Sequence, residues 1–81
     1  MAVQTKVYIL ASFEADGEKE LFEYIKSKDE VEECWIVFGE WDLVIEVRLT
    51  SEEKLTDFIL DLRKNTSVKL TTTLIGAKPI V

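Results

Sequence analysis

Apolar residues recur along this chain with two different periods, and the alternation between them predicts the order of its secondary structure. Short runs rich in β-branched and aromatic residues, bounded by turn residues, predict four strands, at 6–13, 31–38, 42–49 and 68–75. Apolar positions spaced three and four residues apart predict two helices, over 17–28 and 50–65. The predicted order is therefore strand, helix, strand, strand, helix, strand.

The ends of the predicted helices carry their own signals. Thr50 followed by Glu53 matches a capping box at the start of the second helix, and Asn65 is a candidate left-handed stop at its end. Asp16, next to Gly17, is a candidate N-cap for the first helix. The apolar stripes that the two helices would bury are Leu21, Phe22 and Ile25 in the first, and Leu55, Phe58, Ile59 and Leu62 in the second.

The two halves of the chain repeat one hydrophobic pattern. A shift of 37 positions places the apolar stripe of the first helix on that of the second, and Val31 on Val68. Two consecutive split βαβ units predict an α+β, ferredoxin-like βαββαβ sandwich, in which a four-stranded antiparallel sheet carries both helices on one face. We expect residues 1–81 to form a single domain with a short C-terminal tail over 76–81.

Two helices can cover only one face of such a sheet, yet both faces are apolar. In the first strand Val7 and Ile9 share one parity and Tyr8 and Leu10 the other, so the pattern leaves open which parity faces the helices. Burying one more large apolar side chain is worth about 1.5–3 kcal/mol, against about 5–15 kcal/mol for a whole domain. We therefore expect dimerisation through the open sheet face; the alternative is that the tail folds over it.

Composition and charge narrow the classes of function. The net charge is −6, from sixteen acidic and ten basic residues, and no basic cluster is present to bind nucleic acid directly. Cys34 is the single cysteine and histidine is absent, so we expect no disulfide, metal, cofactor or catalytic residue, and no enzyme. No apolar run reaches the roughly 20 residues of a membrane span, and no signal-peptide pattern opens the chain, which predicts a cytoplasmic protein.

The turn between the second and third strands holds the strongest candidate for a binding site. Gly39 permits a tight reversal, and Glu40, Trp41 and Asp42 then place two carboxylates and an indole at the end of a strand. Either carboxylate could bind an amine or a metal ion, although aspartate also commonly caps its own turn. The indole of Trp41 is expected to line a ligand pocket or a subunit contact, because solvent exposure of so large an apolar group is unfavourable.

A run of threonine in the last predicted strand is the second candidate. The hydroxyls of Thr71, Thr72 and Thr73 could bind a polar ligand if a pocket lies beside them. Threonine is also simply a good strand former, and that interpretation holds in the absence of a neighbouring pocket.

Together these features resemble the effector-binding (RAM) domain of the Lrp/AsnC regulators. The resemblance runs from about residue 7 to 75 and includes the opening strand, the Asp16-Gly17 turn, the second strand entered at Val31 and the threonine-rich last strand. Its most specific piece is Gly39-Glu40-Trp41-Asp42-Leu43, which is similar to that family's Gly-x-aromatic-Asp hairpin. The helix-turn-helix of full-length members has no counterpart here, so the chain looks like a stand-alone version.

The resemblance implies a dimer of back-to-back sheets, and dimers that assemble into a ring such as an octamer. It also implies amino-acid effectors in clefts between dimers, bordered by the turn 39–42. The turn amides would receive the carboxylate, Asp42 would meet the amino group, and the threonines at 71–73 would supply hydroxyls. Such a domain would sense an amino acid and modulate transcription by co-assembling with full-length Lrp/AsnC regulators, without contacting DNA itself.

Two rival interpretations stay open at this point. A dimeric α+β barrel enzyme of the small monooxygenase type would use the same protomer, but it needs a polar or histidine-bearing reactive centre and this chain has no histidine. A pure assembly module would use the same sheet contact and bind no ligand.

Overall fold

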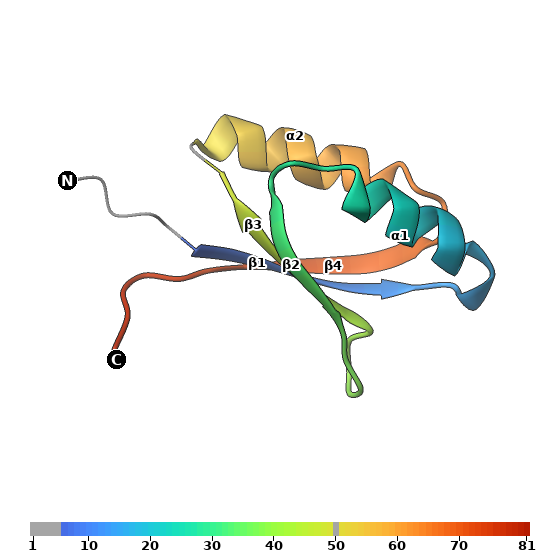
Figure 1. Ribbon diagram of the computed structural model, residues 1–81, viewed down its shortest axis with the longest axis horizontal. Coiled ribbons are helices and arrows are strands. Elements are labelled where there is room, and N and C mark those ends of the chain that lie inside the picture. Colours follow the sequence, from blue (N-terminus) through green and yellow to red (C-terminus); the bar gives the residue numbers. More distant parts are fainter. Residues whose placement is uncertain (1–5, 50) are drawn as a thin grey trace.

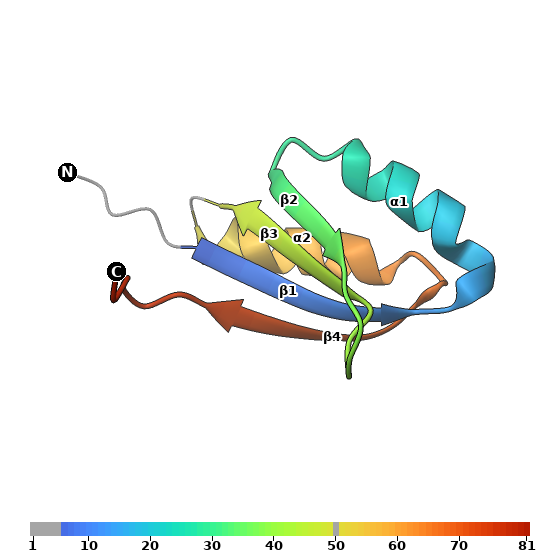
Figure 2. The same ribbon diagram turned by 60° about the horizontal axis from the view of Figure 1, so that its bottom comes forward.

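The computed structural model describes residues 6–49 and 51–81. Along the chain they form β1 (Lys6–Phe13), the short 3-10 helix η1 (Ala15–Gly17), α1 (Glu18–Lys26), β2 (Val31–Ile36), β3 (Leu43–Arg48), α2 (Glu52–Arg63) and β4 (Val68–Ile75). The strands pair antiparallel in the order β2-β3-β1-β4, and both helices lie on one face of the sheet (Figure 1, Figure 2). The predicted ferredoxin-like βαββαβ sandwich is therefore confirmed.

The strand register shows which side-chain parity faces the helices. Residues directly opposite each other in an antiparallel pair lie on the same face, and β1 pairs with β3 through Val7↔Val47, Ile9↔Ile45 and Ala11↔Leu43. All six of these residues are buried, together with four side chains from the helices, Leu21, Ile25, Phe58 and Leu62. This set is the core, and it lies between the sheet and the two helices.

The opposite face of the sheet remains uncovered in the single chain. One row of paired residues across it is Trp35–Val44–Leu10–Thr72, and a second is Glu33–Glu46–Tyr8–Leu74. The side chains of Trp35, Leu70 and Leu74 are exposed. The tail does not cover this face, because residues 76–81 are all exposed and run away from the sheet (Figure 1).

Several predicted element ends differ from the observed ones. Gly17 is the N-cap residue of α1 and the Asp16 side chain caps nothing, because η1 takes up that turn. At the start of α2, Ser51 Oγ accepts a hydrogen bond from the Lys54 N–H over 3.2 Å, while the predicted cap at Thr50 lies outside the described residues. Asn65 has no positive φ. Its side chain instead stabilises the turn after α2, by accepting hydrogen bonds from the N–H and the hydroxyl of Ser67.

The connection before α1 packs directly against the connection after α2. Ser67 is buried, and its carbonyl accepts a hydrogen bond from the Glu14 N–H over 2.7 Å. A Cβ atom on Gly17 would lie 2.2 Å from the Ser67 Cβ, which is closer than real atoms approach. Glycine is therefore needed here for space, and the close contact joins the two halves of the chain at one end of the sheet.

The C-terminal ends of the helices are joined by a polar cluster. Tyr24 Oη donates a hydrogen bond to Asp61 Oδ2 over 2.6 Å, and Lys28 Nζ lies 3.0 Å from the same oxygen and 5.0 Å from the Tyr24 ring centroid. Hydrogen bonds from Tyr24 and then Lys28 lower the pKa of the Asp61 carboxyl, whereas burial and the bond to Asp61 raise the pKa of the Tyr24 hydroxyl. The cluster therefore stabilises the ionised form of Asp61.

Candidate functional site

The turn that joins β2 to β3 projects from the sheet on the side away from the helices (Figure 1). Its base is closed by a hydrogen bond from the Val37 N–H to the Asp42 carbonyl, with N and O separated by 2.9 Å. Gly39 has a φ of 156°, the one positive φ among the residues that the structure describes. Phe38 stands at the tip of the turn with its side chain 99% exposed.

Asp42 has a structural role that the turn pattern alone does not show. Its Oδ2 accepts a hydrogen bond from the Phe13 N–H over 3.1 Å, and its own N–H donates to the Ala11 carbonyl over 3.0 Å. The register of β1 against β4 shifts between Ser12 and Phe13, and the carboxylate receives the amide at this irregularity. The same carboxylate has a second oxygen, so an amine can still approach Asp42.

The other turn residues differ in exposure. Glu40 is exposed, Trp41 is half-buried, and nothing lies within 4 Å of the position that a Cβ on Gly39 would occupy. The turn amides and the two carboxylates therefore lie on an open projection rather than in a hollow of one chain. A ligand held by this turn would need a wall from another molecule.

The threonines of β4 do not point to one place. Thr71 and Thr73 pair with Ala11 and Ile9 and share the helix-covered face, whereas Thr72 pairs with Leu10 on the open face. β4 is also separated from β3 by β1, which corresponds to about 10 Å between β3 and β4. The predicted set 71–73 is therefore split between the two faces, and within one chain it is not brought against the 39–42 turn.

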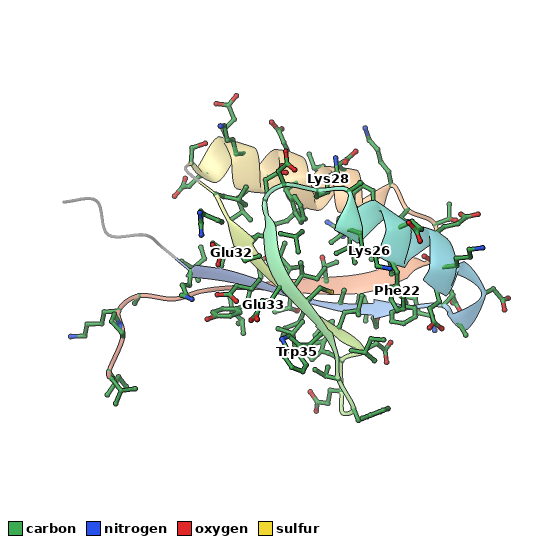
Figure 3. The ribbon with its side chains drawn as sticks, viewed as in Figure 1. Phe22, Lys26, Lys28, Glu32, Glu33 and Trp35 are labelled. Carbon is green, nitrogen blue, oxygen red and sulfur yellow. The ribbon has the colours of Figure 1, made fainter. Side chains whose placement is uncertain are left out.

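A groove that the sequence did not indicate lies between α1 and β2. It has a volume of about 330 Å³. Its floor is apolar and consists of Phe22, Ile25, Val31, Cys34, Ile36 and Leu43, and its rim carries two lysines and two glutamates, Lys26, Lys28, Glu32 and Glu33. Figure 3 shows Phe22 and Lys26 on α1 across from Glu32 and Glu33 on β2. The groove lies at one side of the sheet, because β2 is an outer strand.

Two of the charged rim residues are already engaged. Lys28 is held by Asp61, and Glu32 forms an ion pair with Arg48. On the floor, partial burial raises the pKa of the Cys34 thiol. One sequence signal could have pointed to this groove. Cys34 and Ile36 are apolar residues on a strand that lies next to a helix of only nine residues.

No helix within the described ranges is long and apolar enough to cross a lipid bilayer.

Known proteins share both the sequence pattern and the fold of this chain. The family model of the Lrp/AsnC ligand-binding domain matches residues 6–81. The crystal structure of FFRP-DM1 is 32% identical, with a TM-score of 0.80, over 89% of this chain and 97% of that chain. The hypothetical protein PHS023 from Pyrococcus horikoshii is 30% identical, with a TM-score of 0.79, over 94% and 93% of the two chains.

A longer protein shares the fold at lower identity. The transcriptional regulator NMB0573 from Neisseria meningitidis, solved as a complex with L-Met, is 21% identical with a TM-score of 0.88; the match covers 95% of this chain and 52% of that one. No curated protein matches the chain. The family model spans all of the residues that the structure describes, including the 39–42 turn, and on that match the chain belongs to the Lrp/AsnC ligand-binding domain family.

Proposed function

We propose that this domain senses a small molecule, with amino acids as the ligand class, in crevices that form when copies of the chain assemble through their open sheet faces. The observation that carries the proposal is the open face itself. Trp35 is 64% exposed there, in a row with Val44 and Leu10, and the 39–42 turn projects past the same face (Figure 1, Figure 3). Contact between two such faces would bury these side chains and give the turn a wall.

The chemistry of the turn supports an amino acid as the ligand. Backbone amides near Gly39 suit a carboxylate, and the Asp42 carboxylate, with one oxygen engaged by Phe13, suits an ammonium group at the other. Thr72 is the one threonine of the predicted set on the open face, so it is the one that would reach such a crevice. NMB0573, which shares the fold, is titled as a complex with L-Met, and this agrees with the proposed ligand class.

The proposed role follows from this coupling of ligand and assembly. A ligand that binds only between copies stabilises the assembled state by mass action, so the level of the ligand sets the degree of assembly. We infer that the domain passes this signal on by contact with full-length regulators of its own family rather than by binding DNA, because its net charge is −6.

Calorimetric titration of the protein with each of the twenty amino acids tests the ligand class. We expect heat from a subset of them, and expect Asp42→Asn to weaken that binding by about tenfold or more, since hydrogen bonds to charged groups are worth roughly 1.5–3 kcal/mol. Asparagine retains an oxygen for the Phe13 N–H, so the variant removes charge without removing the structural hydrogen bond. Asp42→Ala would remove both, and it is less informative because the fold would also be weakened.

Glu40→Gln is the matched control, since Glu40 is an exposed carboxylate on the same turn. Its binding should stay within about twofold of the original protein, as expected for an exposed charge. Unchanged heats for Asp42→Asn would remove Asp42 from the site. No heat from any amino acid, in a protein that still assembles, would contradict the sensing role and leave an assembly module.

A further inference from the structure

Part of the helix-covered face of the sheet stays open beside β2. Cys34 pairs with Ile45 and Ile36 pairs with Leu43, so these two residues of β2 lie on the same face as the core. Ile36 is nevertheless 55% exposed, and Cys34 is exposed as well. The groove between α1 and β2 occupies this part of the face, so its floor is apolar surface that the two helices of the chain leave unshielded.

The groove extends from the surface to the core. Its lining includes Ile25 and Leu43, which are only 4% and 1% exposed. Its volume of about 330 Å³ lies at the lower end of the range for small-molecule sites, roughly 300–1,000 Å³. Such sites are mostly apolar and contain a few polar groups that orient the ligand. The groove therefore suits a small molecule with a long apolar part.

The acidic residues at the rim place no free negative charge over the floor. Glu32 forms an ion pair with an arginine of β3, as described above. Glu33 pairs with Glu46 in the strand register and therefore lies on the open face of the sheet, away from the floor. Lys28 is likewise neutralised, by its contact with an aspartate of α2.

Lys26 is the charged rim residue that remains available to a ligand. It is exposed, and it takes part in none of the ion pairs found among residues 6–49 and 51–81. Lys26 follows Phe22 by four positions on α1, so the two side chains are neighbours on the helix surface. Both line the groove on the α1 side, across from β2 (Figure 3). An ammonium group thus borders the apolar floor.

We propose that this groove binds a small monocarboxylate with an aliphatic chain, the chain lying on the floor and the carboxylate meeting the Lys26 ammonium. The chain supplies most of the affinity, because each methylene that is fully buried contributes roughly fourfold. The exposed ion pair adds a smaller factor and sets the sign of the head group. The site lies on the helix side within one copy, whereas the 39–42 turn of the proposed function projects from the other side (Figure 1).

Alkylation of Cys34 by iodoacetamide reports whether the groove is occupied, since Cys34 is the single cysteine and lies on the floor. The probes are octanoate, octylammonium and octanol, which share a chain length and differ in the head group. We expect octanoate to slow the alkylation saturably, and octylammonium to need about three- to fivefold higher concentrations for the same protection, as for an exposed ion pair. Hexanoate should protect severalfold more weakly than octanoate.

A charge reversal at the rim tests the role of Lys26. Lys26→Glu should reverse the preference, so that octylammonium protects Cys34 better than octanoate does. Lys19→Glu is the matched control, because Lys19 is exposed on the same helix but does not line the groove. Its preference should stay that of the original protein. Equal protection by octanoate and octanol, or a preference that Lys26→Glu leaves unchanged, would overturn the assignment of a carboxylate.

Two further variants locate the site. Ile36→Glu places a carboxylate on the floor and should abolish protection by octanoate, whereas Trp35→Ala, on the opposite face, should leave it unchanged. Protection lost in Trp35→Ala but kept in Ile36→Glu would show that octanoate binds the open face instead. No protection by octanoate up to about 10 mM, near the weakest affinity expected for a ligand of its size, would overturn the site itself.

The remaining occupant to test is a second copy of the chain. Alkylation of the ligand-free protein should proceed at one rate across the concentrations where sedimentation shows self-association. A rate that falls as the protein associates would show that another copy covers the groove, and would overturn the proposal. Amino acids that give no heat in calorimetry would contradict the proposed function alone, because protection of Cys34 by octanoate does not depend on them.

Discussion

The two faces of the sheet are made from alternate residues of the same strands, yet they differ in what they determine. On the helix-covered face, Ile9, Ile45 and Leu43 are shielded almost completely by the chain itself. On the open face, Trp35 and its neighbours in the row are apolar but lie beside charged residues such as Glu33 and Glu46. The first face holds the fold together, and the second is uncovered in the single chain.

This difference shows how a small domain can keep the residues that stabilise its fold apart from those that are proposed to form a contact. A strand alternates its side chains between two faces, so one stretch of sequence can serve both purposes without compromise. In the proposed function, the apolar row of the open face provides the area for a contact, and charged residues lie beside this row. Substitutions one residue apart on β3 should therefore have different consequences.

The largest effect is expected for the covered face. Ile45→Ala removes a fully buried side chain and should lower the free energy of unfolding by about 2–5 kcal/mol at any protein concentration. The adjacent Val44→Ala, on the open face, is the control and should cost less in dilute protein. Chemical denaturation at two protein concentrations measures both. Equal losses for the two variants would remove the distinction between the faces.

A smaller effect on association is expected for the open face. Trp35→Ala should weaken self-association in sedimentation by about 30-fold, the value for a contact residue worth about 2 kcal/mol, while the unfolding of dilute protein changes little. Leu60→Ala is the matched control, because Leu60 is 54% exposed but lies on α2. Association that survives Trp35→Ala unchanged would show that the open face is not the contact.

The smallest expected effect is a pH dependence of stability, which arises in the polar cluster that joins the two helices. Because the pKa of the Asp61 carboxyl is lowered in the folded protein, chiefly by Tyr24 and Lys28, its stabilisation is present above the ordinary pKa of about 3.9 and is lost as the pH falls through the lower folded value. Tyr24→Phe should therefore destabilise the protein more at pH 7 than at pH 2.5. Thermal unfolding across this range measures the difference.

The double variant Tyr24→Phe with Asp61→Asn tests the assignment. If Asp61 is the group responsible, the effect of Tyr24→Phe should lose its pH dependence in the Asp61→Asn background. A pH dependence that persists there would assign it to another carboxyl.

Much of the candidate site could be predicted from local sequence, and the failures have clear causes. Gly39, Trp41 and Asp42 are unusual neighbours, and together they predict the turn at 39–42, whose role as a binding site stays a prediction. The hydrogen bond from the Phe13 N–H to Asp42 could not be predicted from local sequence, because it joins residues 29 positions apart. The split of the threonines was available from the two-residue period of a strand, which places Thr72 opposite to its neighbours.

The sequence by itself determined the order and kind of the elements, because hydrophobic period and most turn signals act over a few residues. It also determined that one apolar face would remain uncovered, because two helices cannot cover both sides of four strands. Only the tertiary structure decided which parity became the core, since both parities of β1 are apolar and the choice depends on how α1 and α2 dock. The groove beside β2 was also decided only by the tertiary structure, because it depends on where α1 lies relative to an outer strand.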